Sequence, residues 1–534
     1  MNKLSGIEAA PELQNVNDRT FLGSLKRQAA HRGDDVAVRF TDGGSYTAPE
    51  LLVQSGRLAA LFTEYGIKAG DRIVILCGNR VEFLWTLFAA GWIGAVTAPL
   101  NVSLRGMTLK HPLDELEPSL VLYENATADA LVGCGGGANV RLLNVDTDPA
   151  FLEIREGRGA TEFPVAHAAG PADLVFISYT SGTTGPSKGI MYSNEMTIAF
   201  GESNDWLFKY TRHDTAFTCL PLFHGNAVFC TLLPAFRAGA LVVYAPRFSA
   251  STYWQQVRNE RATVLNLLGS MVPILLDQPP STGDAATTAR IALAVPMPNK
   301  RFHEFQERFG MKLTSLYGMT DMGVLVGVPH DIPGRPGKCG IENPIWECFL
   351  ADDDDMPVPD GVIGELLARP RRPHIMQLGY WRNPESTVNT WRNLWFHTGD
   401  YLRRDAEGWY EFIDRKKDAM RRFGENISSY EVELALQSHP EVEEVAVYAV
   451  AAQLEEDEVM TSMVLKKGST VTAAELLKHC ELELPYYAVP RYYRLVAELP
   501  RTQTAKIQKG ELRRIGIDDL TWDAGPRGRS KRGR

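Results

Sequence analysis

Residues 179–189 read YTSGTTGPSKG and follow directly after an apolar run, residues 173–179, that is typical of a β-strand. Small and hydroxylated residues succeed one another here, so backbone N–H groups and hydroxyl donors can surround the oxygens of a polyphosphate. The glycines permit close approach and unusual backbone angles. The pattern is not a Walker loop, because GxxxxGK[ST] has no match there. The residues of this loop predicted to hold phosphate groups are Thr180, Ser181, Gly182, Thr183, Thr184, Gly185 and Lys188.

Upstream of this loop, strand and helix patterns alternate. Residues 36–40 and 72–76 read as strands. Between them Thr47 and Glu50 have the spacing of a capping box, and Gly66 is placed to end the helix that the box begins. We interpret this stretch as a βαβ unit in a largely parallel sheet.

Downstream, the alternation continues before the pattern changes. From about residue 335 to 413, short strands separated by Gly and Asp turns predict a β-rich subdomain. The last hundred residues combine a capped helix after Ser428 with a strand over residues 442–451. The sequence therefore predicts an α/β protein with a large N-terminal domain, residues 1–416, of stacked, mostly parallel sheets with helices, and a small α+β C-terminal domain, residues 417–534.

Composition places the chain among multidomain globular proteins. It has 534 residues, 44% hydrophobic and 23% charged, with a formal net charge of -9. This balance gives no general attraction for nucleic acid, and we interpret the basic C-terminal end as solvated. The charge-free run over residues 83–100 contains Gly91, Gly94 and Pro99, so we expect a buried helix leading into a strand and no membrane span.

The cysteines and the first residues bear on the compartment. The seven cysteines show no CxxC pair, which argues against a zinc site or a disulfide framework. Residues 1–10 lack the apolar core of a signal peptide. We expect a cytoplasmic protein, monomeric or homodimeric.

Five further motifs follow the loop in a fixed order. They are Tyr317-Gly318-Met319-Thr320-Asp321, Phe396-His397-Thr398-Gly399-Asp400, Asp414-Arg415-Lys416-Lys417-Asp418, Gly424-Glu425-Asn426-Ile427-Ser428, and Pro500-Arg501-Thr502 through Lys506. With the loop, they make residues 20–515 resemble the adenylate-forming superfamily of acyl- and aryl-CoA ligases, firefly luciferase and peptide-synthetase adenylation domains. The resemblance implies a carboxylic acid–CoA ligase that uses ATP, Mg²⁺ and coenzyme A and has a mobile C-terminal domain.

The resemblance also implies roles in nucleotide binding. Asp400 would accept hydrogen bonds from the ribose hydroxyls, and Arg415 would hold ribose or phosphate. Tyr317 would lie along adenine, with Gly318 and Met319 beside it; a core tyrosine is the alternative. Thr320 would face the phosphates as a catalytic-site residue.

Two positions depart from the family pattern. Asp321 stands where a glutamate usually helps to bind magnesium, and it is one methylene shorter. Phe423 replaces the first glycine of a Gly-Gly-Glu turn near the path of CoA, so it could narrow that path, which Gly424 and Glu425 continue. Lys417 corresponds to the hinge about which the C-terminal domain rotates; a solvated charge is its alternative.

The acyl pocket is predicted around His224, which would gate thiol entry or polarise water near the reacting carboxylate; a structural histidine is the alternative. Small residues would make room and methionines would adapt to the acid. The other predicted lining residues are Asn226, Ala227, Gly269, Ser270, Met271, Ala294, Met297, Met319 and Met322.

Two substrate classes remain open. The stretch over residues 249–280 resembles crotonobetaine/carnitine–CoA ligases, which favours a quaternary ammonium acid. The predicted pocket offers no carboxylate except Asp321, which favours a bulky aromatic or apolar acid, and we prefer this second class. The alternatives in function are a medium-chain acyl-CoA ligase, an enzyme that loads a separate carrier protein, a luciferase-type oxygenase and a nucleotide-binding sensor. A downstream acyltransferase is a possible partner.

Lys506 is the first candidate for catalysis, because in the family this lysine bridges the carboxylate and the α-phosphate. Its compact ammonium group would stabilise charge that develops in the transition state. We expect Lys506→Ala to lose on the order of a hundredfold or more in the rate of adenylate formation, measured by acid-dependent pyrophosphate release. Adenylate formation near the wild-type rate would remove this role.

Overall fold

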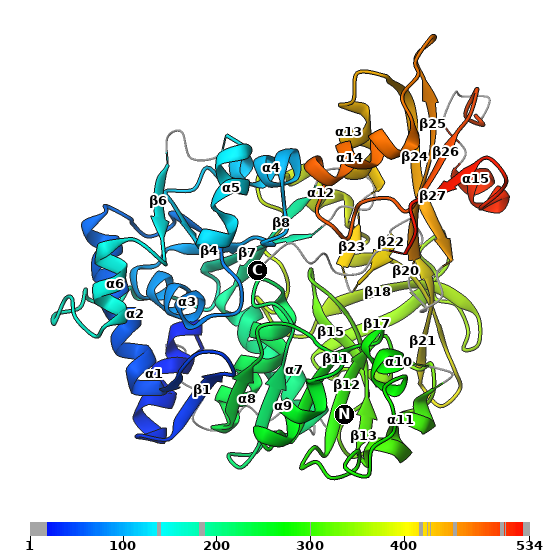
Figure 1. Ribbon diagram of the computed structural model, residues 1–534. Coiled ribbons are helices and arrows are strands. Elements are labelled where there is room, and N and C mark those ends of the chain that lie inside the picture. Colours follow the sequence, from blue (N-terminus) through cyan, green and yellow to red (C-terminus); the bar gives the residue numbers. More distant parts are fainter. Residues whose placement is uncertain are drawn as a thin grey trace.

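The computed structural model describes residues 19–135, 140–180, 187–298, 301–415, 420–423, 425–427, 429–451, 457–501, 507 and 509–526. Figure 1 shows a large N-terminal domain, blue to yellow, and a smaller C-terminal domain, orange to red. Residues 416 and 417, the predicted domain boundary, lie outside the described ranges, so this boundary stays a prediction.

One large sheet has the strand order β13-β12-β11-β9-β10-β1-β2. Its neighbouring strands are parallel except β1 and β2. The strands are β1 Val36–Phe40, β2 Ser45–Thr47, β9 Thr215–Thr218, β10 Leu241–Tyr244, β11 Val264–Leu268, β12 Ile291–Val295 and β13 Lys312–Thr314.

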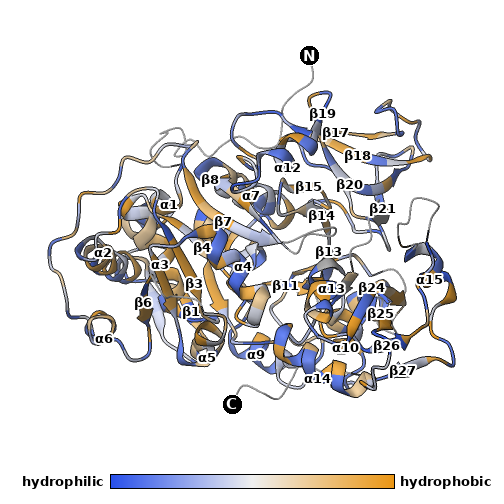
Figure 2. Ribbon diagram, turned by 90° about the horizontal axis from the view of Figure 1, so that it is seen from above, coloured by the Kyte–Doolittle hydropathy of each residue, from blue (hydrophilic) through white to orange (hydrophobic). Residues whose placement is uncertain are grey.

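A second large sheet has the order β6-β5-β3-β4-β7-β8. Its neighbouring strands are parallel except β7 and β8. The strands are β3 Arg72–Leu76, β4 Val96–Pro99, β5 Leu120–Tyr123, β6 Arg141–Asn144, β7 Leu174–Thr180 and β8 Lys188–Ser193. Most strands of both sheets are apolar, as Figure 2 shows at the centre of the large domain.

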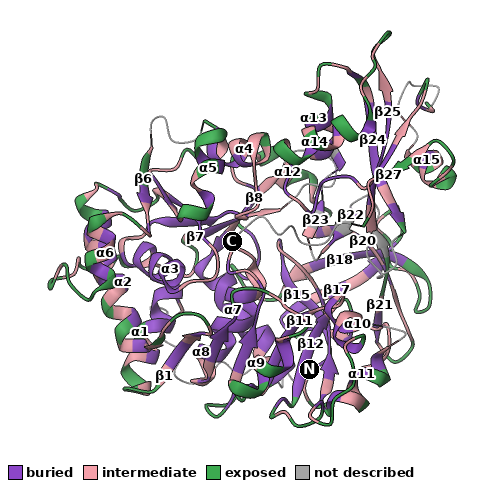
Figure 3. Ribbon diagram, viewed as in Figure 1, coloured by how far each residue is buried: buried purple, intermediate pink, exposed green. Residues whose placement is uncertain are grey.

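Helices fill the space between these two sheets. One hydrophobic core contains Ile73 and Ile75 of β3, Val242 and Tyr244 of β10, and the apolar faces of the helices between them. Figure 3 shows α3 and α7 coloured as buried. The helices of this layer are α1 Phe21–Arg32, α2 Ala48–Glu64, α3 Val81–Ile93, α7 Asn194–Phe208, the π-helix η3 Asn226–Leu232 and α8 Leu233–Ala238.

The outer faces of both sheets are covered as well. Val74 and Leu76 alternate with the inward side chains of β3 and pack against α4 and α5, as the period of a strand requires. Phe217 and Leu265 lie in the core that α9, α10 and α11 cover. The outer helices are α4 Gly106–Leu116, α5 Asn125–Gly133, α9 Tyr253–Asn259, α10 Met271–Leu276 and α11 Phe302–Phe309; α6 Pro149–Arg155 packs on α2. The large domain is therefore a stack of helix and sheet layers, as predicted.

One early prediction is wrong. Strands β1 and β3 flank α2, whose capping box forms as expected at Thr47 and Glu50. They belong to different sheets, so they are not the two strands of one βαβ unit. Helix α2 lies in the layer between the sheets, and the chain crosses from one sheet to the other through it.

The β-rich region follows as expected. Its sheets are β14-β15-β16 and β17-β18-β20-β19, with β21 paired to β20. The elements are β14 Leu316–Met319, β15 Gly323–Gly327, β16 Ile341–Glu342, β17 Trp346–Ala351, β18 Ile363–Pro370, α12 Pro384–Asn389, β19 Trp391–Arg392, β20 Trp395–Arg404 and β21 Tyr410–Arg415.

The C-terminal domain is built on the sheet β24-β25-β26-β27. One face packs on α13 and α14, where Leu436 and Leu476 are buried, and the other packs on α15 through Leu512. Helix α14 contacts α4 of the large domain. The elements are β22 Met420–Arg422, β23 Glu425–Ile427, α13 Ser429–Gln437, β24 Val442–Ala451, β25 Asp457–Leu465, α14 Ala473–Glu483, β26 Tyr492–Leu495, α15 Lys509–Ile515 and β27 Thr521–Asp523.

Gly340 gives a test of this packing. Its φ is +121°, and an added Cβ would lie 2.0 Å from the carbonyl oxygen of Gly327 in β15. Gly340→Ala must therefore displace backbone, and we expect it to cost about 3 kcal/mol or more of unfolding free energy. Gly408→Ala is the matched control, because Gly408 has a φ of +84° with no atom within 4 Å of an added Cβ. The control should cost only about 1–2 kcal/mol. Thermal denaturation measures both; equal shifts would contradict the steric argument.

Candidate functional site

The ends of the predicted phosphate loop lie side by side. Thr180 ends β7 and pairs with Lys188, which begins β8, so the loop closes an antiparallel hairpin. Ser181, Gly182, Thr183, Thr184 and Gly185 lie outside the described residues. Thr180 and Lys188, the described residues on either side of the loop, therefore lie together at the end of the sheet where β7 ends.

Helix α4 contacts the hairpin on both sides of its loop. The hydroxyl of Tyr179 donates to Glu115 Oε2 at 2.6 Å, and the Nε2 atom of His111 lies 3.1 Å from the carbonyl oxygen of Ser187. Burial and the Glu115 carboxylate raise the pKa of Tyr179, so its proton stays in this hydrogen bond.

The segment after β14 reaches the same hairpin. Asp321 is buried and its Oδ1 atom accepts hydrogen bonds from the hydroxyl of Tyr380 and, at 3.1 Å, from Gln377 Nε2. The Lys188 ammonium lies 5.1 Å from the centre of the Tyr380 ring, within cation–π range. The backbone carbonyl of Thr320 accepts from the hydroxyl of Tyr192 on β8 at 2.6 Å. These contacts join the predicted phosphate and magnesium residues.

The predicted adenosine residues also meet. Tyr317 lies in β14 with Gly318 and Met319, and its hydroxyl donates to Asp400 Oδ2 at 2.8 Å. Asp400 lies in β20 directly opposite Arg415 of β21. Tyr317 is 7% exposed and belongs to the core of the β-rich region. Its hydroxyl nevertheless binds the carboxylate of Asp400, the residue predicted to bind the ribose.

His224 contacts the C-terminal domain. Its Nε2 atom lies 2.7 Å from Glu425 Oε2, and its side chain is 41% exposed. The predicted role of His224 near the reacting carboxylate and its alternative, a satisfied structural histidine, both stay predictions. Phe423, by contrast, turns back onto its own domain: its φ is +54°, and its ring stacks on Tyr486 with centroids 6.2 Å apart.

The predicted acyl-pocket residues lie on four segments of the chain. Asn226 and Ala227 begin η3 close to His224. Gly269 lies against the 294–297 segment, because its N–H donates to the carbonyl of Val295 at 2.8 Å. Met271, Ala294 and Met297 share one core cluster, whereas Met319 and Met322 belong to that of the β-rich region. Ser270 directly precedes α10 and makes no side-chain capping hydrogen bond to it.

Lys417, Gly424 and Lys506 lie outside the described residues. The described residues that flank Lys506 are Arg501 and Ile507, which bridge each other. Ile507 packs in the core between the C-terminal sheet and α15, whereas α13 and α14 cover the opposite face. Figure 1 shows α15 at the outer edge of the molecule.

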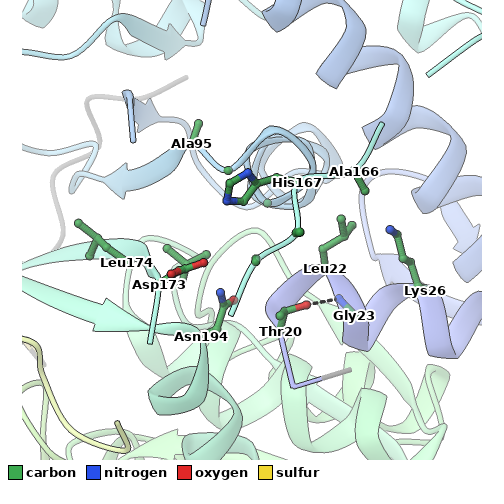
Figure 4. A pocket seen from close by; sticks show the side chains of 15 residues that line it. Thr20, Leu22, Gly23, Lys26, Ala95, Ala166, His167, Asp173, Leu174 and Asn194 are labelled. Carbon is green, nitrogen blue, oxygen red and sulfur yellow. Dashed lines mark hydrogen bonds between the residues drawn. The ribbon is translucent and has the colours of Figure 1, made fainter. Parts of the chain in front are cut away.

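A separate hollow of about 360 Å³ lies between α1, α3 and the segment before β7 (Figure 4). Its polar groups have structural uses: Thr20 accepts from Gly23 N, and the Asn194 amide binds Phe21 and Gly170. None of the predicted site residues lines it.

The family of the chain follows from comparison with known proteins. Residues 25–381 match the model of the AMP-binding enzyme, and residues 431–506 match that of the AMP-binding enzyme C-terminal domain. The chain belongs to the AMP-binding enzyme family. Crotonobetaine/carnitine–CoA ligase from Salmonella paratyphi B is 28% identical over 492 residues, which cover 88% of this chain and 93% of that protein.

Solved structures agree with this assignment. MatB from Rhodopseudomonas palustris is 26% identical with a TM-score of 0.68, covering 93% of this AMP-binding enzyme and 98% of that chain. The o-succinylbenzoate CoA synthetase from Bacillus subtilis, bound to a product analogue, has a TM-score of 0.81 at 24% identity and covers 94% and 99% of the two chains; at this identity it supports the fold.

These findings confirm the predicted superfamily, the fold class and the general activity. This AMP-binding enzyme is an AMP-forming acid–CoA ligase. The substrate and the individual roles of the site residues stay predictions. Every helix within the described ranges is too short or too polar to span a membrane.

Sequence reasoning missed several residues of this AMP-binding enzyme that support the site. Tyr380 and Gln377 hold Asp321, and His111 and Glu115 hold the hairpin. None belongs to a motif used in the prediction, and each lies 50 or more residues away in sequence from the group it contacts, so no local signal could have found them.

Glu431 was also missed, and it joins the C-terminal domain to the phosphate loop. Its Oε1 atom accepts a hydrogen bond from Ser187 N at 2.8 Å. Burial raises the pKa of Glu431 to about 7, because desolvation outweighs the hydrogen bonds from Ser187 that favour the ionised form. The Tyr487 side chain also faces this carboxyl group.

This pKa predicts pH-dependent stability. Because Glu431 binds its proton more tightly when buried than when exposed, its contribution is fully present below about pH 4.5 and is lost as the pH rises through about 7. Glu431→Gln keeps an acceptor for Ser187 N but cannot ionise. Between about pH 5 and 8 we expect the wild type to lose up to about 3 kcal/mol of unfolding free energy relative to Glu431→Gln. The melting temperature of the wild type should fall relative to that of the variant over the same range.

The matched control is Glu443→Gln, which removes an exposed carboxylate from the neighbouring strand β24. Its melting temperature should follow that of the wild type at each pH. A constant difference between wild type and Glu431→Gln across the pH range would contradict the prediction.

Proposed function

We propose that this enzyme activates a bulky aromatic or apolar carboxylic acid with ATP and passes the acyl group to the thiol of coenzyme A. A carboxylate oxygen bonds to the α-phosphorus, and the bond to the bridging oxygen breaks, releasing pyrophosphate. The thiol sulfur then bonds to the acyl carbon, and AMP leaves. The thiol proton passes to a base or to solvent.

The observation that carries this proposal is a continuous set of contacts across the predicted nucleotide site. Lys188 contacts Tyr380, Tyr380 binds Asp321, and the same segment presents Tyr317 to Asp400. The ends of this set would serve the phosphates and the ribose. A chain that only kept the fold would not need to bring these polar side chains together.

Magnesium would enter with ATP. Among the described residues no three His, Cys, Asp or Glu side chains group as a metal site. Asp321 offers a hard oxygen ligand, although its Oδ1 atom already accepts two hydrogen bonds. This donor set fits an ion that takes most of its ligands from phosphates and water. Bound there, magnesium would neutralise phosphate charge.

We infer that the C-terminal domain has the arrangement needed for the thiol step. Glu425, on the predicted path of CoA, lies against His224, whereas the residues flanking Lys506 lie on the far side of the domain sheet. Adenylation would then require the domain to rotate near Lys417. We propose that His224 gates the entry of the thiol and that its contact with Glu425 holds the open path.

The pocket chemistry favours an uncharged acyl group. The predicted lining residues include no carboxylate, and the neighbouring Asp321 is assigned to magnesium and already binds Tyr380 and Gln377. A quaternary ammonium group would lack a partner there and would lose hydration on entry. The similarity to crotonobetaine/carnitine–CoA ligases supports the opposite choice, so the two substrate classes need a direct comparison.

The decisive experiment measures pyrophosphate release with benzoates, naphthoates, medium-chain acids, crotonobetaine and carnitine, each with and without CoA. We expect kcat/KM for the best aromatic or apolar acid to exceed that for carnitine by at least roughly tenfold, because an unpaired cation would be buried. Turnover of carnitine or crotonobetaine alone would overturn the substrate assignment.

Product analysis in the same assay separates the remaining alternatives. Acyl-CoA and AMP should appear together when CoA is present. If a carrier protein is acylated and no acyl-CoA forms, the carrier protein and not CoA is the acceptor of the acyl group. Absence of acid-dependent pyrophosphate release with every acid would favour a nucleotide-binding sensor.

A further inference from the structure

Glu365 lies behind the predicted ribose carboxylate and belongs to none of the motifs that define the site. It is in β18 and is 3% exposed. Its Oε1 atom accepts a hydrogen bond from the backbone N–H of Gly399 at 3.0 Å. Gly399 directly precedes Asp400, so Glu365 binds the peptide that leads into the ribose-binding residue.

The conformation at Gly399 makes this hydrogen bond important. Gly399 has a φ of +71° in the left-handed region, although an added Cβ would meet no atom within 4 Å. Contacts on the side where a Cβ would lie therefore do not restrict the backbone at Gly399, and glycine itself has wide backbone freedom. A buried carboxylate that accepts from the Gly399 N–H limits that freedom.

Asp400 has two further anchors. The Tyr317 hydroxyl donates to its Oδ2 atom at 2.8 Å. Its backbone N–H donates to Thr398 Oγ1 at 3.2 Å, and the Thr398 hydroxyl donates to the carbonyl of Leu366 at 2.8 Å. Tyr317 orients the carboxylate, whereas Thr398 and Glu365 orient the backbone from which the carboxylate extends.

Glu365 is itself held in place. The His397 Nδ1 atom lies 3.4 Å from Glu365 Oε2, and the His397 side chain is 7% exposed. On its other side, the His397 Nε2 atom lies 3.7 Å from Asp355 Oδ2. Because a carboxylate that is desolvated needs donors, Glu365 is directed toward the N–H of Gly399 and away from water. The Nη2 atom of Arg392 lies 2.8 Å from the same His397 Nδ1 atom, so this nitrogen accepts from Arg392, and His397 packs beside Glu365 without donating to it.

We propose that Glu365 is a positioning residue for the nucleotide ribose: it fixes the Gly399 turn so that both oxygens of Asp400 can accept the ribose hydroxyls. This inference rests on the proposed role of Asp400. Glu365 does not contact the nucleotide itself. Removing its carboxylate leaves Tyr317 and Thr398 in place but releases the Gly399 peptide.

The test compares ATP with 2′,3′-dideoxy-ATP, which lacks both ribose hydroxyls. For Glu365→Ala we expect KM for ATP to rise roughly tenfold, because the variant loses one hydrogen bond to a charged group. The kcat of this variant should stay within about twofold of the wild-type value. KM for the dideoxy nucleotide should change little. Glu365→Gln should restore most of the ATP affinity, because its amide oxygen still accepts from Gly399 N.

Two further variants complete the design. Glu365→Asp keeps the charge but withdraws the carboxylate from Gly399, so it should behave as Glu365→Ala does and replaces it if the alanine variant does not fold. Glu347→Ala is the matched control: Glu347 lies on the neighbouring strand β17, is 39% exposed and pairs with Arg369. Both nucleotides should bind this control as they bind the wild type.

Equal weakening of ATP and dideoxy-ATP in Glu365→Ala would overturn the proposal and leave Glu365 a general stabilising role. A wild-type enzyme that does not distinguish the two nucleotides would overturn it too, by removing the role of Asp400. Equal weakening in Glu365→Ala would overturn only the role of Glu365 and would leave the proposed function standing. A wild type that does not distinguish the nucleotides would also overturn the proposed role of Asp400, so the two outcomes are distinguishable.

Discussion

The hydrogen bond between the Tyr317 hydroxyl and the Asp400 carboxylate joins two sheets that pack around one core of the β-rich region. Tyr317 extends from the strand that follows the large parallel sheet, and Asp400 from a long strand of the neighbouring antiparallel sheet. A buried carboxylate is stable only with donors, so this bond constrains how the two sheets meet. The candidate nucleotide site depends on that constraint.

The same rule applies around the rest of the site, which must accept a polyanion. Asp321, Glu365 and Glu431 are carboxyl groups close to the place proposed for ATP, and each accepts hydrogen bonds from neutral donors. Neutral donors hold a carboxylate without cancelling the positive charge that phosphates need. The Lys188 ammonium correspondingly lies 5.1 Å from the centre of the neutral Tyr380 ring, a contact that does not neutralise its positive charge.

The C-terminal domain adds a second level of control. Among the described residues, its side-chain hydrogen bonds with the large domain join Glu425 with His224, Glu431 with Ser187, and Asn101 with Tyr487, beside the contact of α14 with α4. Small polar interfaces between domains favour relative motion. One polar contact between the domains can be exchanged for another at little cost in free energy. Two successive reactions at one site require such an exchange when the domain moves between them.

The sequence by itself determined the order of the motifs, the local elements and the family. The strand over residues 173–179 and the capping box at Thr47 depend on neighbouring residues, so local patterns predict them. The antiparallel pairing of that strand with β8 was not predicted, and the short strands begin at Leu316, earlier than the predicted residue 335. The comparisons confirm the family and its activity, because ordered motifs over most of the chain specify both.

Only the tertiary structure decided which strands share a sheet and which side chains support the site. The strands on either side of α2 look alike in sequence, yet they enter different sheets. Glu365, Tyr380 and Glu431 lie far in sequence from the groups they bind, and hydrogen bonds between distant residues leave no periodic or local pattern. Their positions follow from packing of the whole chain, which is why sequence analysis found Asp400, Tyr317 and Asp321 but not Glu365 behind Asp400 or Tyr380 beside Asp321.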